Sequence, residues 1–168
     1  MNILQIVGYQ NSGKTTFIEK ICKRADQNEL KFGCLKHHGH GGKPDRMTKE
    51  KDSDRYLDAG ALVAGVEGEG EFHLMVNHMS MDSILILLKH LPIDGILIEG
   101  YKQAQYPKII CARNEQELKE LAALSNVQAA IYLSDYLSTK NEYPFPVFSA
   151  YEEQGVVFAL NLLKEAKA

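Results

Sequence analysis

Eight residues near the start of the chain have the types and spacing of a phosphate-binding loop. Residues 8–15 read Gly-Tyr-Gln-Asn-Ser-Gly-Lys-Thr and match the pattern G-x-x-x-x-G-K-[ST]. In such a loop the glycines let the backbone approach a phosphate closely, the lysine reaches the β- and γ-phosphates, and the final hydroxyl suits Mg²⁺. The residues predicted to bind phosphate are Gly8, Gln10, Asn11, Ser12, Gly13, Lys14, Thr15 and Thr16.

The segments on either side of this loop supply the context that the motif requires. The apolar run 3–7 indicates a β-strand, and Phe17, Ile18 and Ile21 recur at helical spacing after the loop. A strand that leads through a glycine-rich turn into a helix directs backbone N–H groups and the positive end of the helix toward one point. A chance match is the alternative, and both flanking segments argue against it.

A phosphate loop of this kind needs an acidic side chain at the end of a neighbouring strand, where it holds Mg²⁺ or its water shell. The apolar run 95–98 indicates a strand buried on both faces, and Glu99 follows it directly. Asp94 lies at the wrong end of this strand. Since ligands gather at the carboxyl ends of parallel strands, Glu99 is the predicted metal residue together with Thr15, and a plain strand-end carboxylate is the alternative.

Three histidines follow the second expected strand, residues 31–36, and should emerge at the same carboxyl edge. Residues 36–40 read Lys-His-His-Gly-His. Imidazoles suit a transition metal, but the neighbours His37 and His38 point opposite ways on an extended chain. Three interpretations stay open: contacts to phosphate or to Mg²⁺-bound water, a metal site, or solvated loop histidines. The first makes His37 and His38 nucleotide-binding residues.

Two further segments are candidates for contacts with the rest of a nucleotide. Residues 39–58 are charged and nearly free of apolar side chains, which indicates a loop leading into a short helix. This loop is either a lid over the nucleotide or a solvated face. Asp135 follows the expected strand 127–133 and has the acceptor that a guanine base needs, although a helix N-cap or Asx turn would use it equally well. The sequence Asn-Lys-x-Asp, which would mark guanine selectivity, does not occur.

Strands and helices alternate along the chain, which predicts an α/β fold of the P-loop NTPase type in a single domain of residues 1–168. The sheet should be mostly parallel, with helices on both faces. Helices are expected near 14–29, 83–91, 114–123 and 152–164, and strands near 2–7, 31–36, 93–100, 107–112 and 127–133. Residues 39–78 break this order with the charged loop and a β-hairpin around Gly68-Glu69-Gly70. We interpret this insertion as a lid or a dimerisation element.

Composition argues against several classes of protein. The 168 residues carry a net charge of −3 with mixed signs, so no basic face for nucleic acid is expected. No run approaches the ~20 apolar residues of a membrane span, and the chain start does not resemble a signal peptide. Cys22, Cys34 and Cys111 have no C-x-x-C spacing, which fits packed thiols in a reducing compartment. We expect a cytoplasmic protein without nucleic-acid or membrane partners.

Four blocks of the sequence resemble the molybdopterin-guanine dinucleotide biosynthesis adaptor (MobB) family. They follow the order of that family over about the first two thirds of the chain. The blocks are residues 8–16, 36–40, 51–61 and 99–108. The phosphate loop is widespread, whereas the histidine block and the Asp-Ser-x-Arg…Ala-Gly-Ala block are far more particular. One departure is the longer spacer 41–50, which concerns the geometry of the charged loop and not the phosphate site.

The resemblance implies a P-loop protein that binds GTP with Mg²⁺ and assists the attachment of GMP to molybdopterin. It implies the molybdenum cofactor guanylyltransferase and a second copy of the chain as partners, with at most weak GTP hydrolysis. In this sequence, residues 8–16 would hold the phosphates, and Thr15 with Glu99 would serve Mg²⁺. The blocks at 37–40 and 52–55 would line the rest of the site.

Two other function classes remain as alternatives. A small-molecule or nucleotide kinase would use Arg46 and Arg55 as lid arginines, although the loop has few arginines for that role. A metal-delivery GTPase would use the histidine block.

Overall fold

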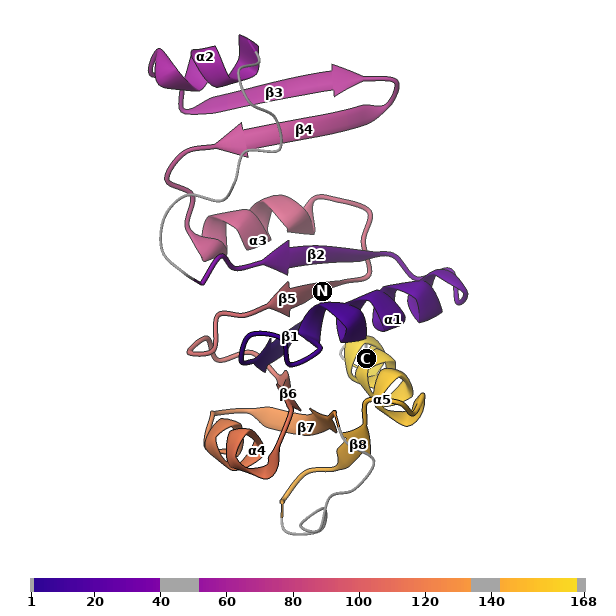
Figure 1. The fold of residues 1–168 in the computed structure, drawn as a ribbon. Coiled ribbons are helices and arrows are strands. Elements are labelled where there is room, and N and C mark those ends of the chain that lie inside the picture. The colour runs from indigo at the N-terminus through magenta and orange to yellow at the C-terminus, as the bar shows by residue number, and fades with distance from the viewer. Residues whose placement is uncertain (1, 40–51, 134–142, 166–168) are drawn as a thin grey trace. The chain divides into compact units, whose positions relative to one another are not determined.

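The protein is described from a computed structural model, which covers residues 2–39, 52–133 and 143–165 (Figure 1). The chain divides into two compact units. The first combines residues 1–41 with 91–168, and the second comprises residues 42–90. The phosphate loop, the first two histidines of the 36–40 block and Glu99 all belong to the first unit, so this unit positions the candidate site.

The first unit is built on a six-stranded sheet in which every neighbouring pair of strands is parallel. Its order is β2-β5-β1-β6-β7-β8. The strands are β1 (Asn2–Gly8), β2 (Phe32–Lys36), β5 (Gly95–Glu99), β6 (Lys108–Ala112), β7 (Val127–Tyr132) and β8 (Val147–Ser149). Because the strands are parallel, Gly8, Lys36 and Glu99 end at one edge of the sheet, as predicted.

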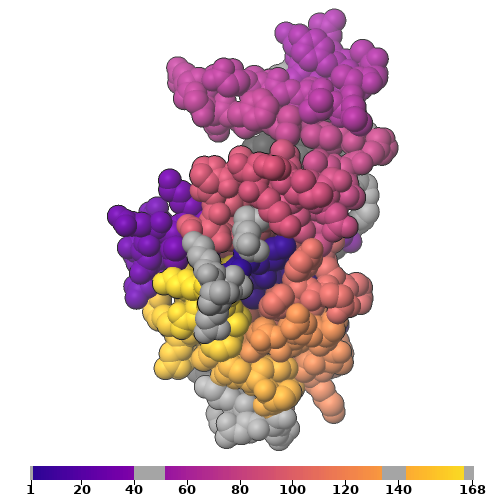
Figure 2. All heavy atoms as spheres, turned by 180° about the vertical axis from the view of Figure 1, so that it is seen from behind, coloured from indigo at the N-terminus to yellow at the C-terminus, as the bar shows by residue number. Residues whose placement is uncertain are grey.

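Helices cover both faces of this sheet, because side chains alternate between the faces along each strand. The helices are α1 (Lys14–Asp26), α4 (Glu115–Ala122) and α5 (Gln154–Glu165). One core packs α1 and α5 on the sheet and includes Leu4, Ile6, Ile21 and Leu160. The other packs α4 and includes Val7, Ile110, Leu118 and Leu121. Figure 2 shows the C-terminal segment beside the β7 region from behind. None of the described helices is long and apolar enough to cross a membrane.

The second unit contains α2 (Asp52–Asp58), β3 (Val63–Gly68), β4 (Glu71–Val76) and α3 (Met81–Lys89). The two strands pair antiparallel, which confirms the predicted hairpin. Its turn residues Glu69 and Gly70 both have positive φ, 53° and 82°, as a type I′ hairpin turn requires. The short helix at the end of the charged segment is also present as expected.

Candidate functional site

The phosphate loop connects β1 to α1 with the backbone geometry that its glycines allow. Gly13 caps α1 at φ 80°, and Asn11 also has a positive φ of 58°. A Cβ on Gly8 would overlap the Ser12 hydroxyl and lie 2.5 Å from the carbonyl oxygen of Cys111. The Ser12 Oγ is itself buried and has no hydrogen-bond partner among the described residues. Any residue larger than glycine at position 8 would therefore displace Ser12 or the end of β6.

The predicted metal residues meet although 84 positions separate them in the sequence. Thr15 Oγ1 donates a hydrogen bond of 3.1 Å to Glu99 Oε2. The other oxygen, Glu99 Oε1, lies 3.6 Å from the ammonium of Lys36, and only 12% of the Glu99 side chain is exposed. Lys14 extends along the loop and donates to the carbonyl of Tyr9 at 2.6 Å. A hydroxyl, a carboxylate and an ammonium thus gather at the N-terminus of α1.

A strained turn follows Glu99. Gly100 and Tyr101 both have positive φ, 97° and 51°. The Gln5 amide donates to the carbonyls of both residues, at 3.0 and 2.8 Å. The Tyr101 ring stacks on His37 with 4.1 Å between ring centroids, and the His37 N–H donates to the Glu99 carbonyl at 2.9 Å. Left-handed backbone at a non-glycine residue persists where the surroundings impose it, and here contacts from β1 and from the end of β2 do so.

The chain after this turn is anchored by a buried lysine. Lys108 opens β6, pairs in register with Gln5 of β1, and is fully buried. Its ammonium donates to three carbonyls, those of Ala104 at 2.9 Å, Tyr106 at 3.1 Å and Ser125 at 2.7 Å. Burial lowers the pKa of Lys108. Gln5 and Lys108 together hold the segment that links β5 to β6.

Tyr9 connects the phosphate loop to two other parts of the site. Its hydroxyl donates to Glu120 Oε2 of α4 at 2.6 Å, and this bond is the main cause of a lowered pKa of Glu120. The ammonium of Lys102 lies 3.9 Å from the centroid of the Tyr9 ring. The sequence predicted no role for Gln5, and it marked Tyr9, Lys102 and Lys108 only as members of the blocks 8–16 and 99–108. The available signal for Gln5 and Lys108 was a polar residue within or at the start of an apolar strand segment.

The histidine block is partly described. His37 stacks on Tyr101 beside Glu99, and His38 is exposed next to it. His40 lies outside the described residues. Within residues 2–39, 52–133 and 143–165, no three His, Cys, Asp or Glu side chains are grouped closely enough to hold a metal ion. The position of His37 is compatible with the phosphate-site interpretation, and its nucleotide-binding role stays a prediction.

The remaining residues predicted for the nucleotide site are Asp135, Arg46 and the segment 52–55. Asp135 and Arg46 lie outside the described residues. The Asp52–Arg55 segment lies in the second unit, where Arg55 pairs with Asp52 at 3.4 Å, so its role at the site stays a prediction. Leu133, the last described residue before Asp135, lies close to the phosphate loop. Its side chain would lie 3.2 Å from a Cβ placed on Gly13. Its carbonyl accepts a hydrogen bond of 3.3 Å from the Tyr151 hydroxyl.

The family model of molybdopterin guanine dinucleotide synthesis protein B (MobB) matches residues 3–133. The chain belongs to the MobB family. The matched residues include the phosphate loop, the histidine block and the turn after Glu99. Among relatives, a probable molybdopterin-guanine dinucleotide biosynthesis adapter protein of Bacillus subtilis is 43% identical over 167 residues, covering 99% of this chain and 95% of that protein.

Solved MobB structures share the fold. The crystal structure of Bacillus subtilis MobB has a TM-score of 0.87 and 41% identity to this chain, with 98% of this chain and 99% of that chain covered. The crystal structure of a MobB homologue from Bacillus stearothermophilus has a TM-score of 0.73 and 31% identity to this chain, and it also covers 98% of this chain and 99% of that chain. These matches confirm the predicted α/β fold and the resemblance to MobB. The family also confirms a role in the biosynthesis of the molybdenum cofactor.

Proposed function

We propose that the protein is a cytoplasmic GTP-binding adaptor that assists the attachment of GMP to molybdopterin. The observation that best supports this proposal is that the side chains of Thr15, Glu99 and Lys14 lie together at the phosphate loop of a chain of the MobB family. The pathway is supported by the relative from Bacillus subtilis, which is named a probable molybdopterin-guanine dinucleotide biosynthesis adapter protein. The guanylyltransferase that forms the dinucleotide is the proposed partner, and GTP hydrolysis is weak at most.

The residues at the loop fit Mg²⁺ bound with the nucleotide. Mg²⁺ prefers hard oxygen ligands and keeps several waters, and the Thr15 hydroxyl and Glu99 carboxylate are oxygen donors 3.1 Å apart. Thr15 would hold the ion, and Glu99 would hold it or its water shell. When bound, Mg²⁺ neutralises charge on the β- and γ-phosphate oxygens. The N–H groups at the start of α1 would bind phosphate oxygens.

Calorimetric titration with nucleotides tests this proposal. With Mg²⁺ present, we expect GTP to bind at least about tenfold more tightly than ATP, because an adaptor for GMP transfer needs a guanine-specific site. The guanylyltransferase should bind the nucleotide-loaded protein in the same experiment, and titration with molybdopterin would show whether the acceptor binds this chain or only the enzyme. Phosphorylation of a small acceptor would instead favour a kinase, and equal affinity for both nucleotides would contradict the adaptor.

We further propose that the hairpin mediates a homodimer. Ala64 on one face of β3 is buried. The opposite face carries Val63, Phe72 and Leu74, which are exposed by 51%, 61% and 40%. A two-stranded sheet has two open edges and is marginally stable alone, so an apolar exposed face supports pairing with a second copy.

Two valines on the same strand provide a matched test of the dimer. Val63→Asp introduces a charge on the apolar face, and we expect it to shift the protein from dimer to monomer in size-exclusion chromatography with light scattering. Val66→Asp is the control, because Val66 is 48% exposed but lies on the other face of β3. A monomeric wild-type protein, or equal behaviour of the two variants, would rule out this face.

A further inference from the structure

We propose that Lys102 is a second phosphate-binding cation, which contacts the terminal phosphate of the nucleotide beside Lys14. This inference rests on the proposed GTP site and deepens it. It starts from the convergence of two ammonium groups on one residue of the phosphate loop. Lys14 Nζ lies 2.6 Å from the carbonyl oxygen of Tyr9, and Lys102 Nζ lies 3.9 Å from the centre of the Tyr9 ring.

The electrostatics of this pair favour an anion between them. Lys102 is half-buried. The carboxylates whose charges act on it, Glu117 and Glu120, already bind Arg113 and Tyr9. Burial and then the charge of Lys14 lower the pKa of Lys102, and the charges of the two carboxylates offset this only in part. Two cations that are partly removed from water repel each other, and a phosphate group placed near both would relieve that repulsion. The face of the Tyr9 ring compensates only part of the lost hydration.

The backbone that carries Lys102 is held in place. Gly100 and Tyr101 have the two consecutive positive φ angles described above, and this turn redirects the chain after β5. The Gln5 amide binds both carbonyls, and the ring of His37 stacks on Tyr101. The turn fixes the backbone of Lys102 and the contact with the Tyr9 ring restrains its ammonium, so less conformational entropy is lost when a ligand binds. This turn therefore presents Lys102 to the phosphate loop as a preorganised group.

The position of Glu99 indicates which phosphate Lys102 meets. In P-loop proteins the Mg²⁺ bridges the β- and γ-phosphates, and the Thr15–Glu99 pair is the proposed metal position. Lys102 follows Glu99, the last residue of β5, by three residues. Its ammonium lies over Tyr9, the residue whose carbonyl Lys14 contacts, and the lysine of such a loop reaches the β- and γ-phosphates, so we place Lys102 at the same end of the phosphate chain. The terminal phosphate has the highest charge there and needs a second cation most.

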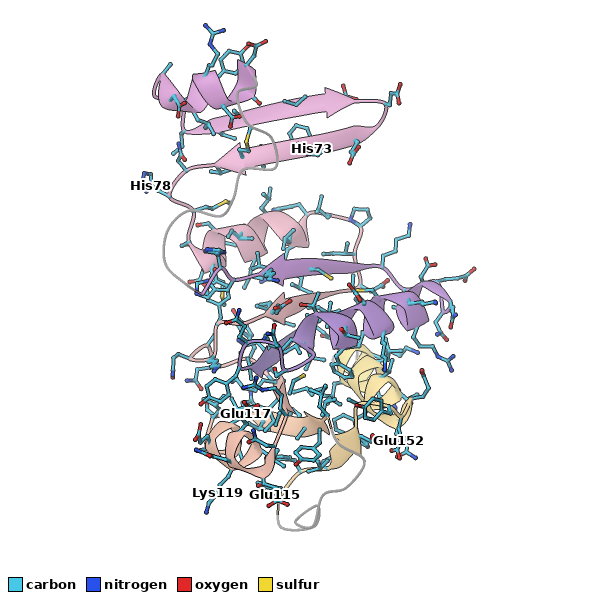
Figure 3. All side chains as sticks on the ribbon, viewed as in Figure 1. His73, His78, Glu115, Glu117, Lys119 and Glu152 are labelled. Atoms are coloured by element: carbon cyan, nitrogen blue, oxygen red, sulfur yellow. The ribbon has the colours of Figure 1, made fainter. Side chains whose placement is uncertain are left out.

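A comparison of GTP with GDP tests this assignment. Lys102→Met keeps most of the side-chain length and removes the charge. We expect it to weaken GTP binding about tenfold in calorimetry and to change GDP binding less than about threefold, because only GTP has the terminal phosphate. Lys119→Met is the matched control: Lys119 is exposed on α4, and Figure 3 shows it on the side of the helix away from Glu117. It should leave both affinities unchanged.

Further variants separate a phosphate contact from a structural role. Lys102→Arg keeps the positive charge and should therefore retain most of the wild-type preference for GTP over GDP. Tyr9→Phe keeps the ring and should retain this preference, whereas Tyr9→Leu should reduce it with little change in melting temperature.

Three outcomes decide between the two proposals. If Lys102→Met weakens GTP and GDP equally, or leaves both unchanged while wild type binds GTP, this inference is wrong and the GTP site stands. If wild type itself does not bind GTP, the proposed function fails first.

Discussion

Replacing Lys14 with alanine should weaken GTP binding by about 3 kcal/mol, or roughly 150-fold, because the variant loses a charge-assisted contact to the phosphates. Among the described residues, the Lys14 ammonium donates a hydrogen bond to the Tyr9 carbonyl within its own loop. The substitution therefore removes little from the fold, and the melting temperature should change by only a few degrees. Calorimetry with GTP and Mg²⁺ measures the loss directly.

Lys23→Ala is the matched control, because Lys23 is an exposed lysine in the last turn of the same helix. It should bind GTP like wild type. Affinity near the wild-type value in a folded Lys14→Ala protein would refute the phosphate-loop assignment.

Replacing Glu99 with glutamine should reduce the Mg²⁺-dependent gain in GTP affinity by about 30-fold. Glutamine has nearly the same shape and can still accept the hydrogen bond from Thr15, so the change isolates the charge. Glu99 is only 12% exposed, and its ion pair with the exposed Lys36 spans 3.6 Å. Loss of that ion pair should affect stability little. The measurement is a Mg²⁺ titration at fixed GTP, with a parallel series in chelator.

Asp94→Asn is the control for Glu99→Gln, because it removes a carboxylate at the opposite end of the same strand. Asp94 precedes the same strand at its amino end, where its carboxylate accepts from the Lys31 N–H at 2.9 Å. Because metal ligands gather at the other edge of the sheet, Asp94→Asn should leave the Mg²⁺ titration unchanged. An unchanged titration in Glu99→Gln would remove Glu99 from the site.

Most strands were predictable because burial on both faces leaves a continuous apolar run in the sequence. Residues 3–7 and 95–98 are such runs, and both form central strands. β8 was missed because it has only three residues and directly follows Pro146, which indicates a loop when read locally. The helix predicted to 29 ends at Asp26, where a turn bonded back to Ala25 replaces the helical bonds.

The phosphate loop was determined by the sequence alone, because its glycines, lysine and threonine act within one short segment between a strand and a helix. The position of Glu99 followed from one general rule about strand ends. Neither prediction needed the order of the strands.

The tertiary structure alone decided the rest of the site. The sheet order places β1 between β5 and β6, and this order cannot be read from local periodicity. Only that order sets Gln5 opposite Lys108 and brings the turn after Glu99 over Tyr9. Local patterns encode which segments become strands, whereas contacts between distant side chains depend on which strands become neighbours and in what register.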